Sequence, residues 1–412
     1  MSDRRSDGPA QDPPYGRAMH LRELRTAGHA PSLAAALLHF DVSFMAWVLL
    51  GALGAYIGED LGLSASAKGL MVAVPLLAAA GFRVALGLLG DRYGPRRVGL
   101  ISMGFVVVAL VLGWLAASSY GALLGVGVLL GVAGASFAIA LPLAGRHYPP
   151  ERQGLAMGIA GAGNSGTVLT TLFAPRLAEA YGWHAVFGLA LIPVTLVWIA
   201  FALLAKEPPA PRTPVRPRDL RNILREPDAW RLCGLYAVTF GTFVGLASFL
   251  PIFFRDQYGI SKVDAATLVA VGAALGSLLR PLGGWLADRA GGTTVLTGVY
   301  ALGAALLLFT SALPELAATA TAFIVAMGTF GVGNGAVFQL VGVRYRERIG
   351  VLTGLVGAAG GLGGFFLPTI LGVVKDALGS FRPGLGAIAA AAAIALITTI
   401  RPSTAALAGA RA

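Results

Sequence analysis

Long apolar runs separated by short polar connections make up most of the chain. About 20 apolar residues in a helix span a hydrocarbon core about 30 Å thick, whereas the strands of a membrane barrel are about half as long. The pattern therefore predicts an all-α polytopic membrane protein with 12 transmembrane helices. The runs cover residues 33–58, 69–90, 98–118, 121–144, 154–176, 184–205, 231–254, 263–287, 293–312, 316–340, 350–374 and 384–401.

The longest polar stretch inside the chain lies between the sixth and seventh runs, from Lys206 to Arg231, and is rich in proline and arginine. It predicts two six-helix bundles joined by a linker. The expected divisions are a cytoplasmic tail at 1–32, an N-terminal bundle at 33–205, a cytoplasmic linker at 206–230, a C-terminal bundle at 231–401 and a cytoplasmic tail at 402–412.

One motif occurs once in each half, and the two copies lie 197 residues apart. The first copy runs from Arg83 to Gly94 and the second from Arg280 to Gly291. In both copies the arginine precedes a glycine by 4 residues, an aspartate by 8 and a final glycine by 11. The repetition indicates two homologous halves related by a pseudo-two-fold axis along the membrane normal.

Each motif arginine lies inside an apolar run, and the Asp-Arg pair marks the end of that run. At ~1.5 Å per residue, each guanidinium lies roughly 12 Å inside the border, near the middle of the bilayer. An unpaired arginine there costs about 2.5–3.5 kcal/mol. Asp41, the one acid well inside a run, cannot neutralise both arginines. The pair predicts a site for a small anion; the alternative is that each arginine caps backbone carbonyls and holds helices together.

A second repeat places glycines at matching positions of the fifth and eleventh helices. Glycine is unfavourable inside a helix unless something must come close, and in membranes it lets helices approach and slide. Two equivalent helices favour a moving interface, with tight static packing as the alternative. The candidate gating glycines are Gly158, Gly161, Gly163 and Gly166 in the fifth helix and Gly357, Gly360, Gly361, Gly363 and Gly364 in the eleventh.

Composition supports this class, because 56% of the residues are hydrophobic and only 12% are charged. The net charge is +11, but the basic residues do not cluster on one segment, which argues against nucleic-acid binding. With the N-terminus inside, cytoplasmic segments hold 23 of the 31 Lys and Arg residues, 6 lie outside and 2 within the membrane. That asymmetry predicts that both termini are cytoplasmic.

Cysteine and histidine usage predicts no catalytic chemistry. Cys233 is the single cysteine, so no intramolecular disulfide can form. The five histidines are scattered, without the spacing of metal ligands, and no nucleophile motif is present. We expect no metal, no cofactor and no enzymatic activity.

The motif residues from Gly87 to Arg97 resemble the loop motif of the major facilitator superfamily between helices 2 and 3, and the second copy resembles its counterpart between helices 8 and 9. The glycines around Asn164 and those that follow Gly357 resemble the two nitrate signatures of the nitrate/nitrite porter family. Residues 276–285 and 333–339 are also similar to that family. The resemblance extends from about Phe40 to Pro402.

The resemblance implies a secondary active transporter of nitrate, and of nitrite, in the bacterial cytoplasmic (inner) membrane, with a monomer expected in the bilayer. It implies that Arg83 and Arg280 bind the anion and that Asn164 donates a hydrogen bond to it, an inter-helix hydrogen bond being the alternative for Asn164. The implied aromatic lining consists of Phe44, Phe137, Tyr236 and Phe240. The implied conformational lock consists of Gly87, Asp91, Arg92, Gly94, Arg96, Gly284, Asp288 and Arg289, with the aspartate paired to a neighbouring helix end.

Uptake of an anion needs an energy source, because entry against 100 mV costs a nitrate ion ~2.3 kcal/mol. Asp41 and His39 in the first helix are candidate proton carriers, although they could instead form ordinary hydrogen bonds at the cytoplasmic mouth. We favour nitrate/proton symport, with nitrate/nitrite antiport as the alternative. A major facilitator for another small anion is a more distant alternative, and a channel or sensor is disfavoured because no signalling domain is visible.

Overall fold

The computed structural model describes residues 27–209, 221–345 and 349–400. Most of the tail expected at 1–32, the centre of the linker expected at 206–230 and the tail expected at 402–412 lie outside these residues. Helices account for nearly all of the described chain. Eleven of them are long and apolar enough to cross a membrane. The fifth expected span, 154–176, is divided into shorter pieces.

Six spans form each half, and three spans of the first half are interrupted. The first half consists of α2 (Ala30–Trp47), α3 (Leu49–Asp60), α4 (Ala65–Tyr93), α5 (Pro95–Leu115), α6 (Tyr120–Gly134), α7 (Phe137–Gly145), α8 (Pro150–Gly161), the 3₁₀ turn η1 (Ala162–Ser165), α9 (Gly166–Tyr181) and α10 (Trp183–Leu204). The second half consists of α12 (Pro227–Tyr258), α13 (Lys262–Ala290), α14 (Gly292–Ser311), α15 (Leu316–Arg344), α16 (Ile349–Leu378) and α17 (Arg382–Ile400). The predicted all-α polytopic architecture is confirmed.

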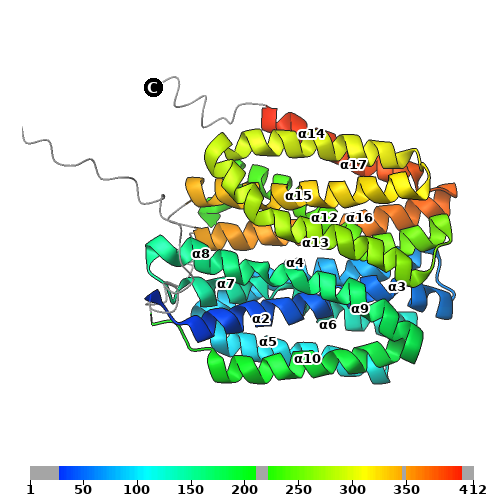
Figure 1. Cartoon of the computed structure of the whole chain (residues 1–412). Helices are drawn as coiled ribbons and strands as arrows, with labels where there is room; N and C mark the ends of the chain where they lie inside the picture. Colours follow the sequence, from blue (N-terminus) through cyan, green and yellow to red (C-terminus); the bar gives the residue numbers. More distant parts are fainter. Residues whose placement is uncertain (1–26, 210–220, 346–348, 401–412) are drawn as a thin grey trace, which may run out of the picture.

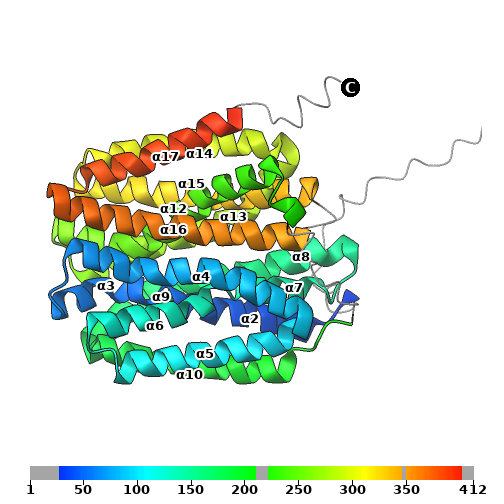
Figure 2. The same ribbon diagram turned by 180° about the vertical axis from the view of Figure 1, so that it is seen from behind.

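The helices run roughly parallel to one another in two bundles, with α2–α10 below and α12–α17 above in Figure 1. The reverse view in Figure 2 shows α4 and α16 side by side where the bundles meet, and these two helices pack against each other along the interface. On the other face, α9 packs against α13. The first residues of α2 and the last residues of α17 lie at the same end of the molecule, which we call the terminal end; the opposite end is the distal end.

The repeated motif has the same structure in both halves. Helices α4 and α13 each contain 29 residues. Arg83 follows Ala65 by 18 residues, and Arg280 follows Lys262 by the same number. Both helices end at a motif glycine with positive φ, 100° at Gly94 and 84° at Gly291. Residues with a Cβ rarely adopt this conformation, so the final glycine of each motif copy serves as the helix C-cap.

The other residues of the first motif copy connect elements of the first half. The Asp91 carboxylate pairs with Arg146, which follows α7. The Arg96 guanidinium donates to the carbonyls of Ala202 and Ala205, both at 2.7 Å, and so satisfies groups at the C-terminus of α10. Arg92 lies over the ring of its neighbour in sequence, Tyr93, at 5.1 Å.

In the second copy, Arg289 lies over the ring of Trp285 at 3.9 Å, and Asp288 is exposed. The inner glycines of the two copies are equivalent in packing. A Cβ on Gly87 would lie 4.0 Å from the Ala138 side chain, and one on Gly284 would lie 4.0 Å from the carbonyl of Gly335. These contacts of Gly87, Gly284 and Arg289 thus lie within their own half in this state.

The two halves are tied together at the distal end. Lys68 pairs with Asp256, and Glu59 pairs with Arg255 at 3.0 Å and with Lys262 at 2.5 Å. The carboxylate of Asp376, at the end of α16, accepts hydrogen bonds from the first backbone N–H groups of α4, those of Ala65 at 3.0 Å and Ser66 at 2.8 Å. These contacts join the first half to the second, so the distal end is closed.

The terminal end is different. The ion pairs there that involve described residues, Asp91–Arg146 and Asp228–Arg344, each lie within one half. Beside Gly158, Gly161 and Gly354 there is no atom within 4 Å of the position that a Cβ would occupy. The helices that border the interface are therefore separated at the terminal end.

Candidate anion-binding site between the halves

Arg83 lies at the interface of the two halves, with 2% of its surface exposed. Its Nε donates to the Gly134 carbonyl at 3.0 Å, and its Nη1 donates to the carbonyl of Gly357 in the other half. The Gly134 carbonyl is available because the chain tightens between α6 and α7, where the Ala138 N–H donates to Ala135 instead. The break between α6 and α7 thus provides a partner for the buried guanidinium.

Aromatic rings surround this guanidinium. Its carbon lies 5.3 Å from the ring centroid of Trp47 and 5.1 Å from that of Phe240. The two rings are nearly parallel, with 10° between their planes, and their centroids are 6.5 Å apart. The Trp47 Nε1 donates to the Pro75 carbonyl at 2.9 Å, which fixes the indole. Such rings stabilise a cation through their negative faces.

Arg280 meets the same set of rings from the second half. Its Nη2 donates to the Tyr236 hydroxyl at 3.4 Å, and its guanidinium carbon lies 5.5 Å from the ring centroid of Phe338. Tyr236 stacks on Phe240 with 9° between the planes and 5.1 Å between centroids. Because Phe240 contacts Arg83 and Tyr236 contacts Arg280, the stacked pair brings the two guanidinium groups together.

The site has two positive charges without a matching carboxylate. In the described part of the chain, none of the ion pairs within 4 Å includes Arg83 or Arg280. The two guanidinium groups repel each other, and this repulsion is strong because a buried site screens charge poorly. An anion held by both groups would relieve it.

The remaining expected aromatic residues lie at different depths. Phe137 is 5.8 Å from Phe338, ring to ring, and so borders the site. Phe44 packs against Phe40 at 4.4 Å and Trp47 at 4.7 Å. Phe44 therefore supports the ring that contacts Arg83, one layer further from the guanidinium groups.

Asn164 lies in η1 and has 3% of its surface exposed. Its side-chain nitrogen is 3.5 Å from the Ser277 hydroxyl of α13, one turn before Arg280. Its Oδ1 is buried and has no hydrogen-bond partner among the described residues. Asn164 thus reaches the second half at the level of the arginine pair.

The candidate gating glycines fall into four groups. Some let a helix of the same half come close. In the first half, a Cβ on Gly163 would lie 2.9 Å from the Asp41 nitrogen, and one on Gly166 would lie 1.9 Å from the Asp41 carbonyl. In the second half, a Cβ on Gly360 would lie 2.6 Å from the Tyr236 ring, and one on Gly363 would lie 2.0 Å from the Ala237 carbonyl. Gly357 and Gly361 face the first half, where the nearest atoms would be Phe137 at 3.6 Å and Ala80 at 3.2 Å. Gly364 lies between the halves, because its Cβ would be 2.7 Å from Val244 of its own half and 3.4 Å from Leu76 of the first half. Gly158 and Gly161 border open space. The glycines thus serve both static packing and the interface.

The structure separates Asp41 from His39. The His39 ring packs against Phe201 of α10, with centroids 4.9 Å apart. The Asp41 carboxylate points to η1, where it accepts a hydrogen bond from the Ser165 hydroxyl at 2.6 Å. Two residues apart on α2, the side chains lie on different faces of the helix.

Sequence reasoning missed Trp47, Ser277 and Phe338, which contact the arginines or Asn164. Each had a signal. Trp47 follows Phe44 by three residues and so lies on the same helical face. Phe338 lies inside the family-like stretch 333–339, and Ser277 lies one turn before Arg280.

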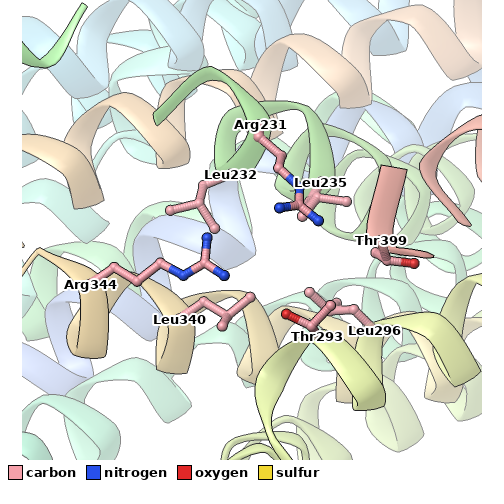
Figure 3. Close-up of a pocket in the computed structure, with 8 residues that line it drawn as sticks. All are labelled: Arg231, Leu232, Leu235, Thr293, Leu296, Leu340, Arg344 and Thr399. Carbon is pink, nitrogen blue, oxygen red and sulfur yellow. The ribbon is translucent and has the colours of Figure 1, made fainter. Parts of the chain in front are cut away.

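A pocket lies within the second half, near the terminal end, between α12, α14, α15 and α17 (Figure 3). Arg231 and Arg344 point into it. Arg344 pairs with Asp228 at 2.6 Å, and Arg231 donates to the Thr398 carbonyl at 2.6 Å. Arg344 is already neutralised by a carboxylate, whereas no described ion pair includes Arg83 or Arg280, which favours the site between the halves.

Residues 35–368 match the family model of the Major Facilitator Superfamily. The chain is 37% identical over 384 residues to the "Probable nitrate/nitrite transporter NarK2" of Mycobacterium tuberculosis, covering 90% of this chain and 96% of the relative. It is 32% identical over 367 residues to the "Nitrite extrusion protein" of Bacillus subtilis, covering 88% and 92%. It is also 32% identical over 370 residues to the "Probable nitrate/nitrite antiporter NarK1" of Thermus thermophilus, covering 81% and 82%.

A solved structure supports the fold. A bacterial homologue of the human lysosomal transporter Spinster, captured in an inward-facing and occupied conformation, has a TM-score of 0.63 and 22% sequence identity, with 89% of this chain and 92% of that chain covered. The arginine pair, the two-fold repeat and these similarities lead to one conclusion. The chain is a multi-pass membrane transporter rather than an enzyme, and it belongs to the nitrate/nitrite porter family of the major facilitator superfamily.

Proposed function

We propose that this protein moves nitrate, and nitrite, across the bacterial cytoplasmic membrane by alternating access, as a nitrate/proton symporter that serves uptake. The observation that carries the proposal is the pair Arg83 and Arg280, one from each half, joined through stacked rings and paired with no described carboxylate. The names of the relatives support nitrate and nitrite as substrates.

The site suits a small flat ion. A guanidinium fork donates parallel hydrogen bonds to a planar oxyanion, and a flat ion fits between ring faces where a tetrahedral one does not. Arg83 uses Nε and one Nη1 hydrogen on carbonyls, so its other N–H groups are available to the ion. Asn164 adds a neutral donor on the opposite side of the interface from Ser277.

The distribution of Lys and Arg supports cytoplasmic termini, with 23 of 31 on that side. In that orientation the closed distal end faces outward, and the separated terminal end faces the cytoplasm. The structure would then represent an inward-facing state. Rocking of 33–205 against 231–401 about the arginine pair would open the distal end and expose the same site to the outside.

Proton coupling supplies the energy in this proposal, with Asp41 as the proton carrier. A nitrate ion that enters with two protons brings in net positive charge, which the membrane potential favours. Exchange of nitrate for nitrite is electrically neutral and is the second candidate, supported by the antiporter name of the Thermus thermophilus relative.

Purified protein in proteoliposomes separates the two modes. Symport predicts that an inward-directed proton gradient drives labelled nitrate uptake without internal nitrite, and that Asp41→Asn abolishes this uptake but leaves nitrate/nitrite exchange. Antiport predicts uptake only when nitrite is inside. Unchanged pH-driven uptake by Asp41→Asn would remove Asp41 from the mechanism.

Arg83→Lys tests the substrate site itself. Lysine keeps the charge but lacks the planar fork that offers parallel hydrogen bonds to a flat anion, so we expect nitrate affinity to fall by about 10- to 150-fold, the value of one charge-assisted hydrogen bond of about 1.5–3 kcal/mol. Arg382→Lys, at an exposed position of α17, is the control and should bind normally. Normal nitrate affinity in Arg83→Lys would show that the fork is not the recognition element.

A further inference from the structure

The fifth span of the first half, α8–η1–α9, is interrupted, whereas its equivalent in the second half is continuous. The 3₁₀ turn η1 (Ala162–Ser165) separates α8 from α9, but α16 runs without interruption from Ile349 to Leu378. Both helices are rich in glycine at matching positions. Glycine content therefore does not explain the break at η1, and a residue that contacts η1 must favour it.

Asp41 of α2 is that residue. Its carboxylate accepts a hydrogen bond from the Ser165 hydroxyl at 2.6 Å, in competition with the Ala162 carbonyl of the same turn at 2.9 Å. Ser165 is the N-cap residue of α9, so the carboxylate lies at the N-terminus of a helix of 16 residues, where negative charge is favourable. The position 197 residues after Asp41 is Val238, which cannot cap anything.

Asn164 lies in the same turn, next to Ser165. Its amide points to Ser277 in the other half, and its buried Oδ1 has no partner among the described residues. A 3₁₀ turn advances about 120° per residue and an α-helix about 100°, so refolding η1 into α-helix would redirect the Asn164 side chain by tens of degrees.

We propose that Ser165 is a positioning residue that makes the direction of the Asn164 amide depend on the proton at Asp41. The inference rests on the proposed function, in which Asn164 binds nitrate. Charged Asp41 accepts from the Ser165 hydroxyl and holds the 3₁₀ turn. A proton on the carboxylate weakens this hydrogen bond, the turn relaxes towards α-helix, and the amide moves relative to Ser277.

Other titratable groups on the elements packed around Asp41 face elsewhere. His39 faces α10, and Arg280 faces Tyr236. Arg176 of α9 lies ten residues beyond Gly166, or about 15 Å along the helix. The charged residues of α8 lie in its first turn, ten residues or so before η1. In the described part of the chain, no ion pair includes Asp41, so its proton acts on the helix cap directly.

The test is a titration of nitrate affinity against pH for protein in lipid nanodiscs. For the wild type we expect affinity to change about tenfold between neutral and acidic pH, as expected when a charge-assisted hydrogen bond is weakened. Ser165→Ala should lose this dependence, Ser165→Thr should restore it, and Asp41→Asn should give one affinity at every pH. Thr171→Val is the matched control, because it removes a hydroxyl of α9 that bonds only to carbonyls of its own helix, those of Thr167 and Val168.

A wild-type pH profile in Ser165→Ala, or the same loss of pH dependence in Thr171→Val, would overturn the inference. The proposed function fails differently. Wild-type protein that binds nitrate with this pH profile, yet shows no uptake in a proton gradient, would refute symport and still support control of Asn164 by Asp41. Wild-type protein that binds no nitrate would overturn both.

Discussion

The closure of the distal end depends on Asp376, and its removal tests how the two halves are held together. The carboxylate accepts from the Ala65 and Ser66 N–H groups, which are the first of α4 and have no partner within their own helix. Asp376 belongs to α16 of the second half, so it caps a helix of the first half. Asp376→Ala removes this cap only when the distal end is closed.

The size of the effect follows from the contacts. Loss of an N-cap costs about 0.5–2 kcal/mol, and the exposure of Asp376 places it at about 1 kcal/mol. The open state has no such contact to lose, so the whole difference enters the equilibrium between closed and open distal ends. Since 1.4 kcal/mol corresponds to tenfold, the ratio of open to closed molecules should rise about fivefold.

Distance measurements between two spin labels read this ratio directly. Cysteines at Ser118 and Ala312, exposed residues at the distal ends of the first and second halves, carry the labels in a Cys233→Ser background. The control is Asp264→Ala, because Asp264 exchanges hydrogen bonds with Ser261 inside the first turn of α13 and makes no such contact with the other half. Equal long-distance populations in Asp376→Ala and Asp264→Ala would refute the reasoning.

Two further predictions concern the interface. Gly158→Ala should slow nitrate transport but leave nitrate affinity unchanged while the terminal end is open, because its Cβ meets open space now and would meet the second half once that end closes. Gly386→Ala, a glycine of α17 with equally open surroundings, should transport normally. Phe338→Ala should weaken nitrate binding more than Phe44→Ala in equilibrium binding assays, because Phe338 lies over Arg280 and Phe44 packs one layer behind Trp47.

The fold could be predicted because it depends on features that repeat. Run length specifies a membrane helix, and the spacing of Arg83 and Arg280 within equal motifs specifies two similar halves. The structure puts both arginines at the same position of helices with the same length. The equivalent positions of the two arginines therefore follow from the sequence alone.

The breaks inside helices could not be predicted in this way. The first, fourth and fifth spans are continuous apolar runs in the sequence. The interruptions near Gly134 and at η1 depend on partners far away in sequence. Arg83 takes the carbonyl freed at Gly134, and Asp41 accepts from the Ser165 hydroxyl at η1. Hydrophobicity reports neither contact, because it records burial and not hydrogen-bond partners.

The different roles of the glycines were also hidden. Gly363 and Gly158 occur in similar glycine-rich segments, yet a Cβ on the first would collide with the Ala237 carbonyl at 2.0 Å and one on the second would meet nothing. A glycine pattern shows where close approach is possible, and only the neighbouring backbone shows whether it is static. Closeness in sequence misleads similarly, because Asp41 and His39, two residues apart, face different helices.

The partners of Arg83 explain why anion binding and rocking are linked in the proposed cycle. Its Nε is held by Gly134 of its own half, but its Nη1 is held by Gly357 of the other half. When the halves move apart at this level, the guanidinium loses one carbonyl and remains buried among rings, which is unfavourable for a charge with an unsatisfied donor. An anion that also binds Arg280 replaces that carbonyl and neutralises the repulsion. The substrate therefore lowers the barrier to rearrangement at a contact through which a buried arginine is bound to both halves.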